Sequence, residues 1–295
     1  MNRRAAVFGS SGQLGVELVR ELKARQYGVI GWDRDEVDIT DASAVERALT
    51  QFDAQVVFNA AAYNQVDVAE REPQAAYLVN ALAVRNLALV CRQMDARLVQ
   101  FSTDYVFDGH HHHPYAEDDS PHPLSAYAVS KLAGEFYARA YLDHALILRT
   151  SGVFGPGGLQ TARGNFVELM LRLAEAGQPI RVVEDHVASP TYSPLLAMRA
   201  IELVERGHTG IFHVGGGAPV SWYQFARTIF DVAKREPMLL ATNEREYRTA
   251  ARRPKYSALS NAKMERVGLD PMPPVRRALE GYFAERSRAV SGTPV

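Results

Sequence analysis

Near its beginning the chain reads Ala5-Ala6-Val7-Phe8-Gly9-Ser10-Ser11-Gly12-Gln13-Leu14-Gly15, followed by a helical pattern of apolar residues. A short apolar strand, a glycine turn and a helix in this order are typical of nucleotide-binding proteins. Gly9 permits the tight turn, Gly12 lets the backbone approach a pyrophosphate, and Gly15 lets the helix pack on the strand. Free N–H groups at the start of the helix then face the anion. We therefore favour a dinucleotide site over a glycine loop without a ligand.

The second predicted strand bears on the choice of cofactor. It runs over Gly28-Val29-Ile30-Gly31-Trp32 and ends at Asp33, eighteen residues beyond Gly15. An acid there accepts hydrogen bonds from an adenosine ribose, whereas Arg34 beside it can pair with a 2′-phosphate. The two residues favour different cofactors, so we expect dual or NADPH-tolerant use, without a strict preference between NADPH and NADH. Asp38-Ile39-Thr40-Asp41 is interpreted as the end of a third strand followed by a helix N-cap.

The composition is that of a globular protein with a small-molecule partner. The chain has 295 residues, 47% hydrophobic and 23% charged, enough for one large α/β domain with a smaller lobe. Lys and Arg number 33 against 34 Asp and Glu, and the net charge of −1 offers no footprint for nucleic acid or an anionic membrane. The single cysteine, Cys91, is interpreted as a reduced core thiol. Since we find no secretory signal and no apolar run of about 20 residues, we expect a cytoplasmic protein.

Two further predicted strands end in residues that suit a ligand. Gln55-Val56-Val57-Phe58, the fourth strand, is followed by small residues from Asn59 to Tyr63, which leave room for a ligand or allow close helix packing. A long helix from Pro73 to about Met94 carries Asn80 on its apolar stripe, either as a brace between the loops after the fourth and fifth strands or as a structural residue. The fifth strand ends at Ser102-Thr103-Asp104, at the strand end where open α/β sheets bind ligands.

A tyrosine and a lysine on the next predicted helix can carry out proton transfer. Ser125 caps this helix, and Tyr127 and Lys131 are four residues apart, which places them on one face, about 5–6 Å apart between β carbons. A free tyrosine has a pKa of about 10, and a nearby ammonium lowers this pKa by stabilising the phenolate. The pair therefore predicts a general acid that works near neutral pH. Because the spacing occurs by chance in many helices, the prediction depends on the surrounding residues.

The loop before this helix contains four consecutive histidines, His110 to His113. Adjacent residues of a loop point in different directions, and no acidic or cysteine partner has a matching periodicity. We therefore predict an exposed loop and no metal site.

The character of the chain changes after a sixth strand, Ala145 to Arg149. A glycine-rich loop from Thr150 to Gly164 has the length of a functional lid, and the elements beyond it no longer alternate strictly between strand and helix. We predict an α/β fold, a doubly wound Rossmann-type parallel sheet with a smaller mixed α/β substrate lobe. The predicted parts are a dinucleotide-binding domain at 1–150 with a contribution from about 180–214, a substrate lobe mainly at 151–285, and a flexible tail at 286–295.

Together these motifs resemble those of the dTDP-4-dehydrorhamnose reductase family, a group of extended short-chain dehydrogenases/reductases. The G-x-x-G-x-x-G spacing of the glycine turn is typical of the wider group, and the resemblance covers nearly the whole chain. Its very specific block is Ser102-Thr103-Asp104-Tyr105-Val106-Phe107-Asp108-Gly109. The other blocks are Gly9 to Gly15, Asn59 to Tyr63 with Val66 to Glu70, Tyr127 to Lys131 with Ala133 to Glu135, Asn165 to Val167, Pro190 to Tyr192, Ser221-Trp222 and Arg253-Pro254.

The resemblance implies reduction of a nucleotide-activated 4-keto-6-deoxy sugar, dTDP-linked, with NADPH or NADH as cofactor; it is also compatible with a homodimer. Tyr127 then protonates the C4 oxygen, Thr103 hydrogen-bonds that oxygen, and Lys131 holds the nicotinamide ribose and lowers the Tyr127 pKa. The implied cofactor-binding residues are Gly9, Ser11, Gly12, Gln13, Leu14, Gly15, Asp33, Arg34, Asp38, Ile39, Ala60, Ala61, Ala62, Tyr63, Tyr127 and Lys131. The implied substrate-binding residues are Val66, Thr103, Asp104, Tyr105, Gly152, Asn165 and Arg253.

Two departures from the family pattern bear on the substrate. The segment Thr150-Ser151-Gly152-Val153-Phe154 lacks the tryptophan that family members usually carry near the hexose. In the same way, His186 replaces a usual glutamine on the sugar-nucleotide side. The nucleotide, the sugar and the product stereochemistry therefore stay open. The substrate could be another 4-keto-6-deoxy sugar, for instance one from a secondary-metabolite or surface-glycan pathway.

Two other functions are compatible with the same scaffold. The first is a non-catalytic NAD(P)-binding regulator similar to the methionine adenosyltransferase β subunit, against which the intact set Thr103, Tyr127 and Lys131 speaks. The second is a sugar-nucleotide epimerase or dehydratase. Dehydratases generally place acidic residues directly after the threonine, and here Asp104 is acidic but Tyr105 is not.

Overall fold

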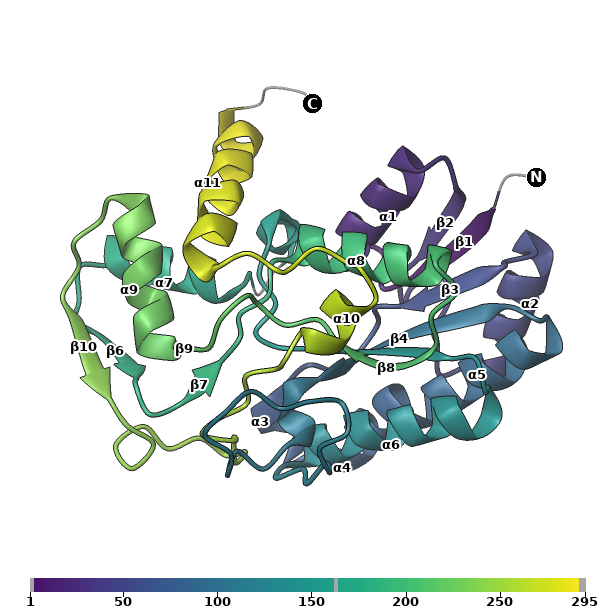
Figure 1. Cartoon of the computed structure of the whole chain (residues 1–295), viewed down its shortest axis with the longest axis horizontal. Helices are drawn as coiled ribbons and strands as arrows, with labels where there is room; N and C mark the ends of the chain where they lie inside the picture. The colour runs from purple at the N-terminus through teal and green to yellow at the C-terminus, as the bar shows by residue number, and fades with distance from the viewer. Residues whose placement is uncertain (1–2, 162–163, 292–295) are drawn as a thin grey trace.

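A six-stranded parallel sheet forms the centre of the computed structural model, which describes residues 3–161 and 164–291 (Figure 1). The strand order is β2-β1-β3-β4-β5-β8. Successive strands are added on one side of β1 first and then on the other, so the switch point, where open α/β sheets bind ligands, lies between β1 and β3. Continuous apolar runs such as Val56-Val57-Phe58 suit strands that are buried on both faces. The strands are β1 (Arg4–Phe8), β2 (Gly28–Trp32), β3 (Val56–Asn59), β4 (Arg97–Thr103), β5 (Leu146–Thr150) and β8 (Gly210–His213).

Helices cover both faces of this sheet, which confirms the predicted doubly wound fold. Figure 1 shows α1 and α8 above the sheet and α5 and α6 below it. Each face has its own apolar core, one under α1 and α8 and the other under α2, α5 and α6. The helices are α1 (Gly15–Ala24), α2 (Ala42–Phe52), α5 (Ala83–Gln93), α6 (Ala126–Tyr141) and α8 (Ser193–Glu205), with the short α3 (Val66–Ala69) and α10 (Ala262–Arg266) at the edges.

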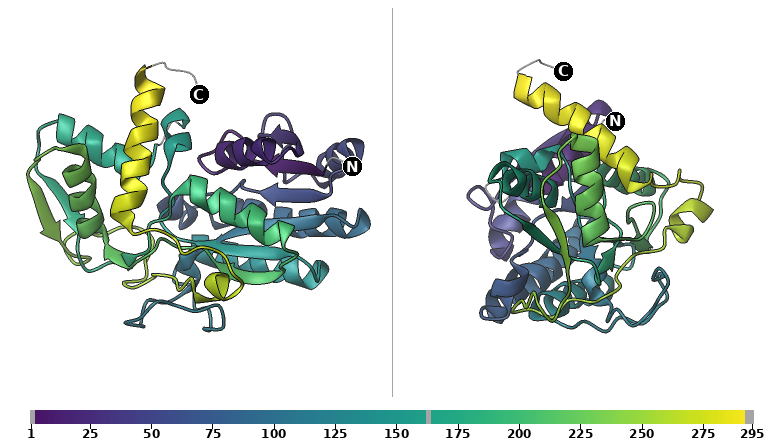
Figure 2. Two further views of the ribbon diagram at one scale, coloured as in Figure 1. Left: turned by 45° about the horizontal axis from the view of Figure 1, so that its top comes forward. Right: turned by 90° about the vertical axis from the view of Figure 1, so that its left-hand side faces the viewer.

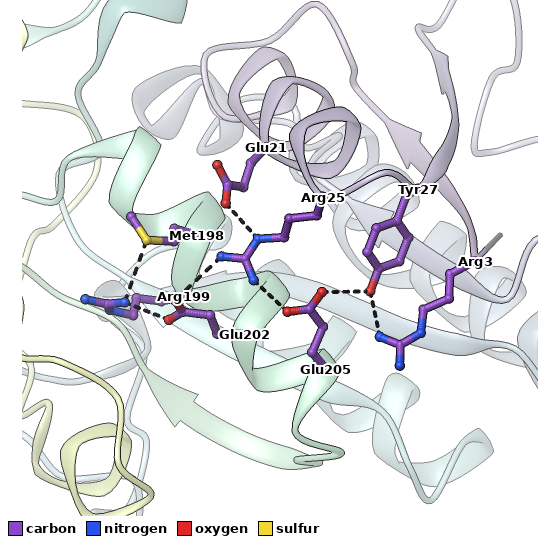
Figure 3. A network of polar contacts seen from close by, with 8 residues as sticks. All are labelled: Arg3, Glu21, Arg25, Tyr27, Met198, Arg199, Glu202 and Glu205. Atoms are coloured by element: carbon purple, nitrogen blue, oxygen red, sulfur yellow. Dashed lines mark hydrogen bonds and ion pairs between the residues drawn. The ribbon is translucent and has the colours of Figure 1, made fainter.

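Charged side chains join α1 to α8 above the first core (Figure 3). Arg25 donates to Glu21 at 2.7 Å and to Glu205 of α8 at 2.6 Å, and Glu202 lies 3.5 Å from the same guanidinium. These side chains are partly exposed, and ion pairs in contact with water contribute about 0–1 kcal/mol each because water screens the charges. The apolar contacts beneath them therefore account for most of the stability of this layer.

The predicted third strand at Asp38-Ile39-Thr40-Asp41 is wrong. Asp38 uses its carboxylate to accept hydrogen bonds from the backbone N–H and the hydroxyl of Thr40, both at 2.8 Å. Such a local turn competes with strand pairing, so the segment is a loop. The predicted N-cap is confirmed, because the Asp41 carboxylate accepts from Ser43 and Ala44 at the start of α2. The fourth, fifth and sixth predicted strands are therefore β3, β4 and β5.

The predicted long helix contains a π-helical segment. It runs as α4 (Pro73–Tyr77), η1 (Leu78–Leu82) and α5. Asn80 in the π segment accepts from the Tyr63 backbone at 2.9 Å and donates to the Tyr63 carbonyl and the Ser130 hydroxyl, both at 3.0 Å. Asn80 thus braces the loop after β3 against α6, and not against the loop after β4. By length and composition this stretch is the one candidate for a membrane span among the described residues, but half of it is buried inside the protein, as in a core helix.

A smaller lobe lies beside the carboxyl ends of the strands (Figure 1). Its core is apolar and includes several aromatic residues, and Figure 2 shows the yellow helix α11 running past this lobe toward the C-terminus. Its strands are β6 (Ile180–Val183) paired with β10 (Leu239–Thr242), and β7 (Val187–Ala188) paired with β9 (Val220–Ser221). Its helices are α7 (Phe166–Glu175), α9 (Trp222–Ala233) and α11 (Val275–Ser291), and the 3₁₀ turns of the chain are η2 (Asp104–Val106) and η3 (Pro156–Gln160).

Two segments differ from the predicted division of the chain. Within 180–214, strand β6 pairs with β10 in the smaller lobe, so only α8 and β8 join the large sheet. Residues 286–291 belong to the end of α11, whereas 292–295 lie outside the described residues. Arg286 pairs with Glu168 of α7 at 2.8 Å, which explains why the predicted flexible tail begins too early.

Replacing Gly15 by alanine is expected to destabilise the protein by roughly 1–3 kcal/mol. A β carbon there would lie 2.0 Å from the carbonyl oxygen of Gly9, so the turn would have to move. Gly28→Ala in β2 is the matched control, because its β carbon would meet nothing closer than 3.5 Å. Urea unfolding followed by circular dichroism measures both variants. Equal urea midpoints for the two variants would show that the close packing of Gly15 against the Gly9 carbonyl does not limit which residue can stand at position 15.

Candidate active site

The glycine turn connects β1 to α1 and touches the loop after β3. Gly9 has φ +73°, and a β carbon on it would lie 2.8 Å from the backbone nitrogen of Ala61. The residue at the N-cap position of α1 is Leu14, which has no polar side chain. No side chain caps this end of the helix, so the N–H groups next to Val16, whose own N–H donates to the Gly12 carbonyl at 3.1 Å, can face an anion.

Two adjoining cavities extend from this turn along the strand ends, one of about 490 Å³ at the end of β2 and one of about 350 Å³ beside α6. Gly12, Ala60 to Ala62 and Asn64 line both, so the two form one groove with the turn at its middle. Of the predicted cofactor residues, the first cavity is lined by Gly9, Ser11, Gly12, Asp33, Arg34, Asp38, Ile39, Ala60, Ala61, Ala62 and Tyr63. The second cavity is lined by predicted residues Gly12, Gln13, Leu14, Ala60, Ala61, Ala62, Thr103, Asp104, Tyr127, Lys131 and Gly152. This shape fits a dinucleotide.

The two residues that bear on the cofactor lie at the far end of the groove. Asp33 accepts from the Ser11 backbone at 3.1 Å and from the Ser10 hydroxyl at 3.2 Å, which holds its carboxylate at the edge of the first cavity. Arg34 is largely exposed and lies 3.3 Å from Asp38. A carboxylate suits ribose hydroxyls and a guanidinium suits a phosphate, so both forms of recognition are present.

Helix α6 brings Tyr127 and Lys131 to the wall of the second cavity. Ser125 caps the helix by accepting from Ala128 at 3.3 Å, which confirms the predicted start. Both Tyr127 and Lys131 are buried, and the Lys131 ammonium donates to the Phe101 carbonyl of β4 at 2.7 Å. Burial lowers the pKa of Lys131 to about 8.

The phenol of Tyr127 differs from the prediction in its acidity. Burial raises the pKa of Tyr127 above its ordinary value, hydrogen bonding with Thr103 opposes this effect, and the charge of Asp104 adds to it. The prediction that Lys131 lowers the pKa of Tyr127 is therefore wrong for the protein without a bound cofactor. Its phenol remains protonated at neutral pH, which is the form required of an acid.

The end of β4 places a threonine and a carboxyl group beside this phenol. Thr103 accepts from the Tyr105 backbone and donates to Asp104, both at 3.1 Å. Asp104 lines the second cavity, but its other oxygen accepts from Ser151 at 2.8 Å and from Ser257 at 2.5 Å. Asp104, predicted to bind substrate, is thus held by hydroxyls of the protein.

A buried ion pair between α6 and β5 was missed by sequence reasoning. Arg149 of β5 donates to both oxygens of Glu135, with a shortest contact of 2.7 Å, and Ser102 donates to Glu135 at 2.5 Å. Glu135 is one turn beyond Lys131 on the same face of the helix, which was the available signal. Nothing in the local sequence identifies Arg149 as its partner.

A third cavity, of about 320 Å³, lies between the two parts of the molecule. Arg253 at its rim donates to both oxygens of Asp67 in α3, at 2.7 and 3.1 Å. This bidentate pair ties the lobe to the large domain. Its lining residues are Asp67, Tyr105, Phe166, Leu169, Met170, Leu173, Arg181, Val182, Val183, His186, Trp222, Glu244, Tyr247, Thr249 and Arg253.

Gly152 stands near the junction of the second and third cavities. It has φ +49°, and a β carbon on it would lie 3.2 Å from the indole of Trp222 in α9. The indole of Trp222 thus lies next to the loop in which the family pattern has a tryptophan, although Trp222 belongs to α9 and not to that loop. His186 is buried at the third cavity, and its Nε2 has no hydrogen-bond partner among the described residues.

Three predicted site residues do not line these cavities. Asn165 caps α7 by accepting from Glu168 at 3.1 Å and donates to the Gly155 carbonyl at 3.0 Å. Val66 packs in an apolar cluster with Tyr127. Gly15 acts through the packing of α1.

The histidine loop is held by its own neighbours. His110 lies 3.3 Å from Asp108, and His111 stacks on Tyr115 with ring centroids 4.4 Å apart. Across the described residues, the group with the spacing of metal ligands lies elsewhere, at Asp185, His186 and Glu244. Lys255 already supplies positive charge there, at 3.8 Å from Asp185 and 3.4 Å from Glu244.

A doubly wound fold with a glycine turn, and a tyrosine, lysine and threonine at the wall of its groove, define a short-chain dehydrogenase/reductase. The model of the RmlD substrate binding domain matches residues 3–288, so the chain belongs to that family.

Named relatives cover nearly the whole chain. The spore coat polysaccharide biosynthesis protein SpsK of Bacillus subtilis (strain 168) is 40% identical over 97% of this chain and 99% of its own. The dTDP-4-dehydrorhamnose reductase of Aggregatibacter actinomycetemcomitans is 38% identical over 91% of this chain and 94% of its own. The crystal structure of dTDP-4-dehydrorhamnose reductase from Bacillus anthracis in complex with NADP has a TM-score of 0.92 and 35% identity, covering 97% of this chain and 100% of that one.

Replacing Arg149 by methionine is expected to destabilise the protein by roughly 3–5 kcal/mol, because it leaves the Glu135 carboxylate buried without its partner. The double variant Arg149→Met with Glu135→Leu should recover most of this loss, because no buried charge remains. Urea unfolding compares the three proteins. If Arg149→Met alone were as stable as the double variant, an unpaired Glu135 carboxylate would not be the cause of the lost stability.

Proposed function

We propose that the protein reduces the 4-keto group of a nucleotide-activated 4-keto-6-deoxy sugar, with NADPH or NADH as hydride donor. The observation that carries this proposal is the meeting of Thr103, Tyr127 and Lys131 at the wall of a groove that fits a dinucleotide. The NADP bound by the Bacillus anthracis relative supports the choice of cofactor.

Residues of this chain provide for the proton and the charge. When bound, a reduced nicotinamide supplies the hydride. Tyr127, whose raised pKa keeps it protonated, donates its proton to the ketone oxygen as negative charge develops there. The Thr103 hydroxyl stabilises the same oxygen. Lys131 lies one turn along α6 at the wall of the same cavity, where its ammonium can hold the ribose of the nicotinamide.

The third cavity has the composition that a nucleotide sugar requires. Phe166, Trp222 and Tyr247 offer apolar faces to a base or a sugar ring, and Arg181 and Arg253 offer positive charge to a diphosphate. The name of the Aggregatibacter relative supports a dTDP-linked substrate, and that of the Bacillus subtilis relative supports a surface-glycan pathway. Within this proposal, the glycine at position 152, packed beside Trp222, selects the sugar.

Tyr127→Phe is expected to lower kcat by roughly 100- to 10,000-fold, because it removes the proton donor and keeps the ring. Affinity for NADPH should not change. The measurement is NADPH oxidation against a panel of nucleotide 4-keto-6-deoxy sugars, with cofactor affinity from a fluorescence titration. Tyr141→Phe at the far end of α6 is the matched control, and it should keep wild-type turnover.

Wild-type rates in Tyr127→Phe would overturn the assigned acid. A wild-type protein that binds NADPH but consumes none with any sugar of the panel would favour the regulatory alternative instead. Tightly retained NAD⁺ after purification would favour an epimerase or a dehydratase.

Arg34→Ala is expected to raise KM for NADPH by roughly 10- to 100-fold, because a charge-assisted contact to the 2′-phosphate is lost. KM for NADH should change little. Asp33→Asn is the complementary variant and should weaken NADH more than NADPH, because ribose hydroxyls lose their carboxylate. Steady-state kinetics with both cofactors test this, and an equal change for both in Arg34→Ala would contradict the role of Arg34.

A further inference from the structure

A carboxyl group with no cationic partner among the described residues lies directly beside the proposed acid. Asp104 is 3% exposed, and hydroxyls from three separate segments donate to it, namely Thr103 at 3.1 Å, Ser151 at 2.8 Å and Ser257 at 2.5 Å. Ser151 and Ser257 bind one oxygen, so the other is left to face Thr103. The group is thus fixed in orientation with one oxygen directed at the threonine hydroxyl.

The hydrogen-bonding capacity of Thr103 is small enough to be counted. A threonine hydroxyl has one proton to donate and two lone pairs that accept. The Tyr105 backbone N–H occupies one lone pair at 3.1 Å. Thr103 therefore has one proton to donate and one lone pair left to accept. Its possible partners are three: Asp104, Tyr127 and the oxygen of a bound ketone.

We propose that Asp104 is a positioning residue whose protonation sets the direction of the Thr103 hydroxyl, with the protonated form active in reduction. This inference rests on the proposed function. An ionised Asp104 accepts a hydrogen bond from the Thr103 hydroxyl. The remaining lone pair of Thr103 then accepts a hydrogen bond from the Tyr127 hydroxyl. Neither hydroxyl proton points at the ketone oxygen in this state. A protonated Asp104 donates to that lone pair, and both hydroxyl protons then turn toward the substrate oxygen.

The surroundings of Asp104 allow it to carry a proton under ordinary conditions. Burial raises the pKa of Asp104 to about 6, against the opposing hydrogen bonds from Ser257, Ser151 and Thr103. The titratable groups that face it are Tyr105 of the same turn and Tyr127 of α6, both neutral below their raised pKa values.

The cations of the site are held by other groups. Lys131 donates to the Phe101 carbonyl, and Arg253 pairs with Asp67. A ketone oxygen that requires two donors favours protonated Asp104, so substrate binding raises the pKa further.

Asp104→Asn tests the inference, because its amide N–H can donate to Thr103 while its oxygen accepts from both serines. The variant thus imitates the protonated carboxyl at every pH. The wild-type kcat/KM should fall about tenfold for each pH unit above about 6, since the active form is lost as Asp104 ionises. The Asn variant should lack this decline. At two units above the pKa it should exceed the wild type by about 100-fold.

Two further variants separate positioning from a structural role. Ser257→Ala removes a donor to the ionised carboxylate, which raises the pKa of Asp104 and should move the decline to higher pH. Asp108→Asn, in the loop after η2, is the matched control and should leave the profile unchanged. Carbon-13 NMR of labelled aspartate carboxyl groups follows the titration of Asp104 without turnover, as the resonance that disappears in Asp104→Asn.

The outcomes distinguish this inference from the proposed function. A wild-type protein that reduces no ketone overturns the proposed function, and this inference with it. An active wild type whose decline with pH persists unchanged in Asp104→Asn overturns the inference alone. So does an Asn variant that binds cofactor but is inactive at every pH, because the ionised carboxylate would then be the active form.

Discussion

The buried ion pair between Glu135 of α6 and Arg149 of β5 is the contact on which the geometry of the site depends. Charges taken out of water are costly unless every partner is satisfied. Here both carboxylate oxygens accept from the guanidinium, Ser102 adds a hydroxyl, and His213 lies 3.5 Å from the remaining nitrogen. A rotation of α6 would break these contacts together. Lys131 and Tyr127, one and two turns earlier on the same face, are therefore held over the strand ends.

The end of β4 connects this pair to the reacting groups. The Phe101 carbonyl binds Lys131, the Ser102 hydroxyl binds Glu135, and Asp104 binds Ser151 and Ser257. Polar groups in a buried network polarise one another, and each would be costly if left unpaired. Three residues within this stretch of four, Phe101, Ser102 and Asp104, thus fix the helix on one side and the segments that carry Ser151 and Ser257 on the other.

The features that the sequence could predict are local ones. Gly9 to Gly15 specify their own turn, and Tyr127 and Lys131 share a face because helical spacing requires it. Arg149 could not be identified, because its partner lies fourteen residues away on another element and its role depends on tertiary packing. Asp38 was misassigned because a side-chain contact with Thr40 outweighs strand propensity. Asn165 has an amide equally suited to a ligand or a helix cap, and only the fold decides between them.

Residues 253–257, which return from the lobe to the large domain, contact both the third cavity and Asp104. Within this segment, Arg253 binds Asp67 at the rim of the third cavity, and Ser257, four residues later, binds Asp104 beside the second. Under the proposed function, a diphosphate that enters the third cavity would compete with Asp67 for the Arg253 guanidinium. Any resulting shift of the segment changes the hydrogen bond from Ser257 to Asp104, and with it the proton affinity of the carboxyl. The residue proposed to recognise the nucleotide, Arg253, and the hydroxyl that donates to Asp104, from Ser257, therefore lie on one stretch of backbone.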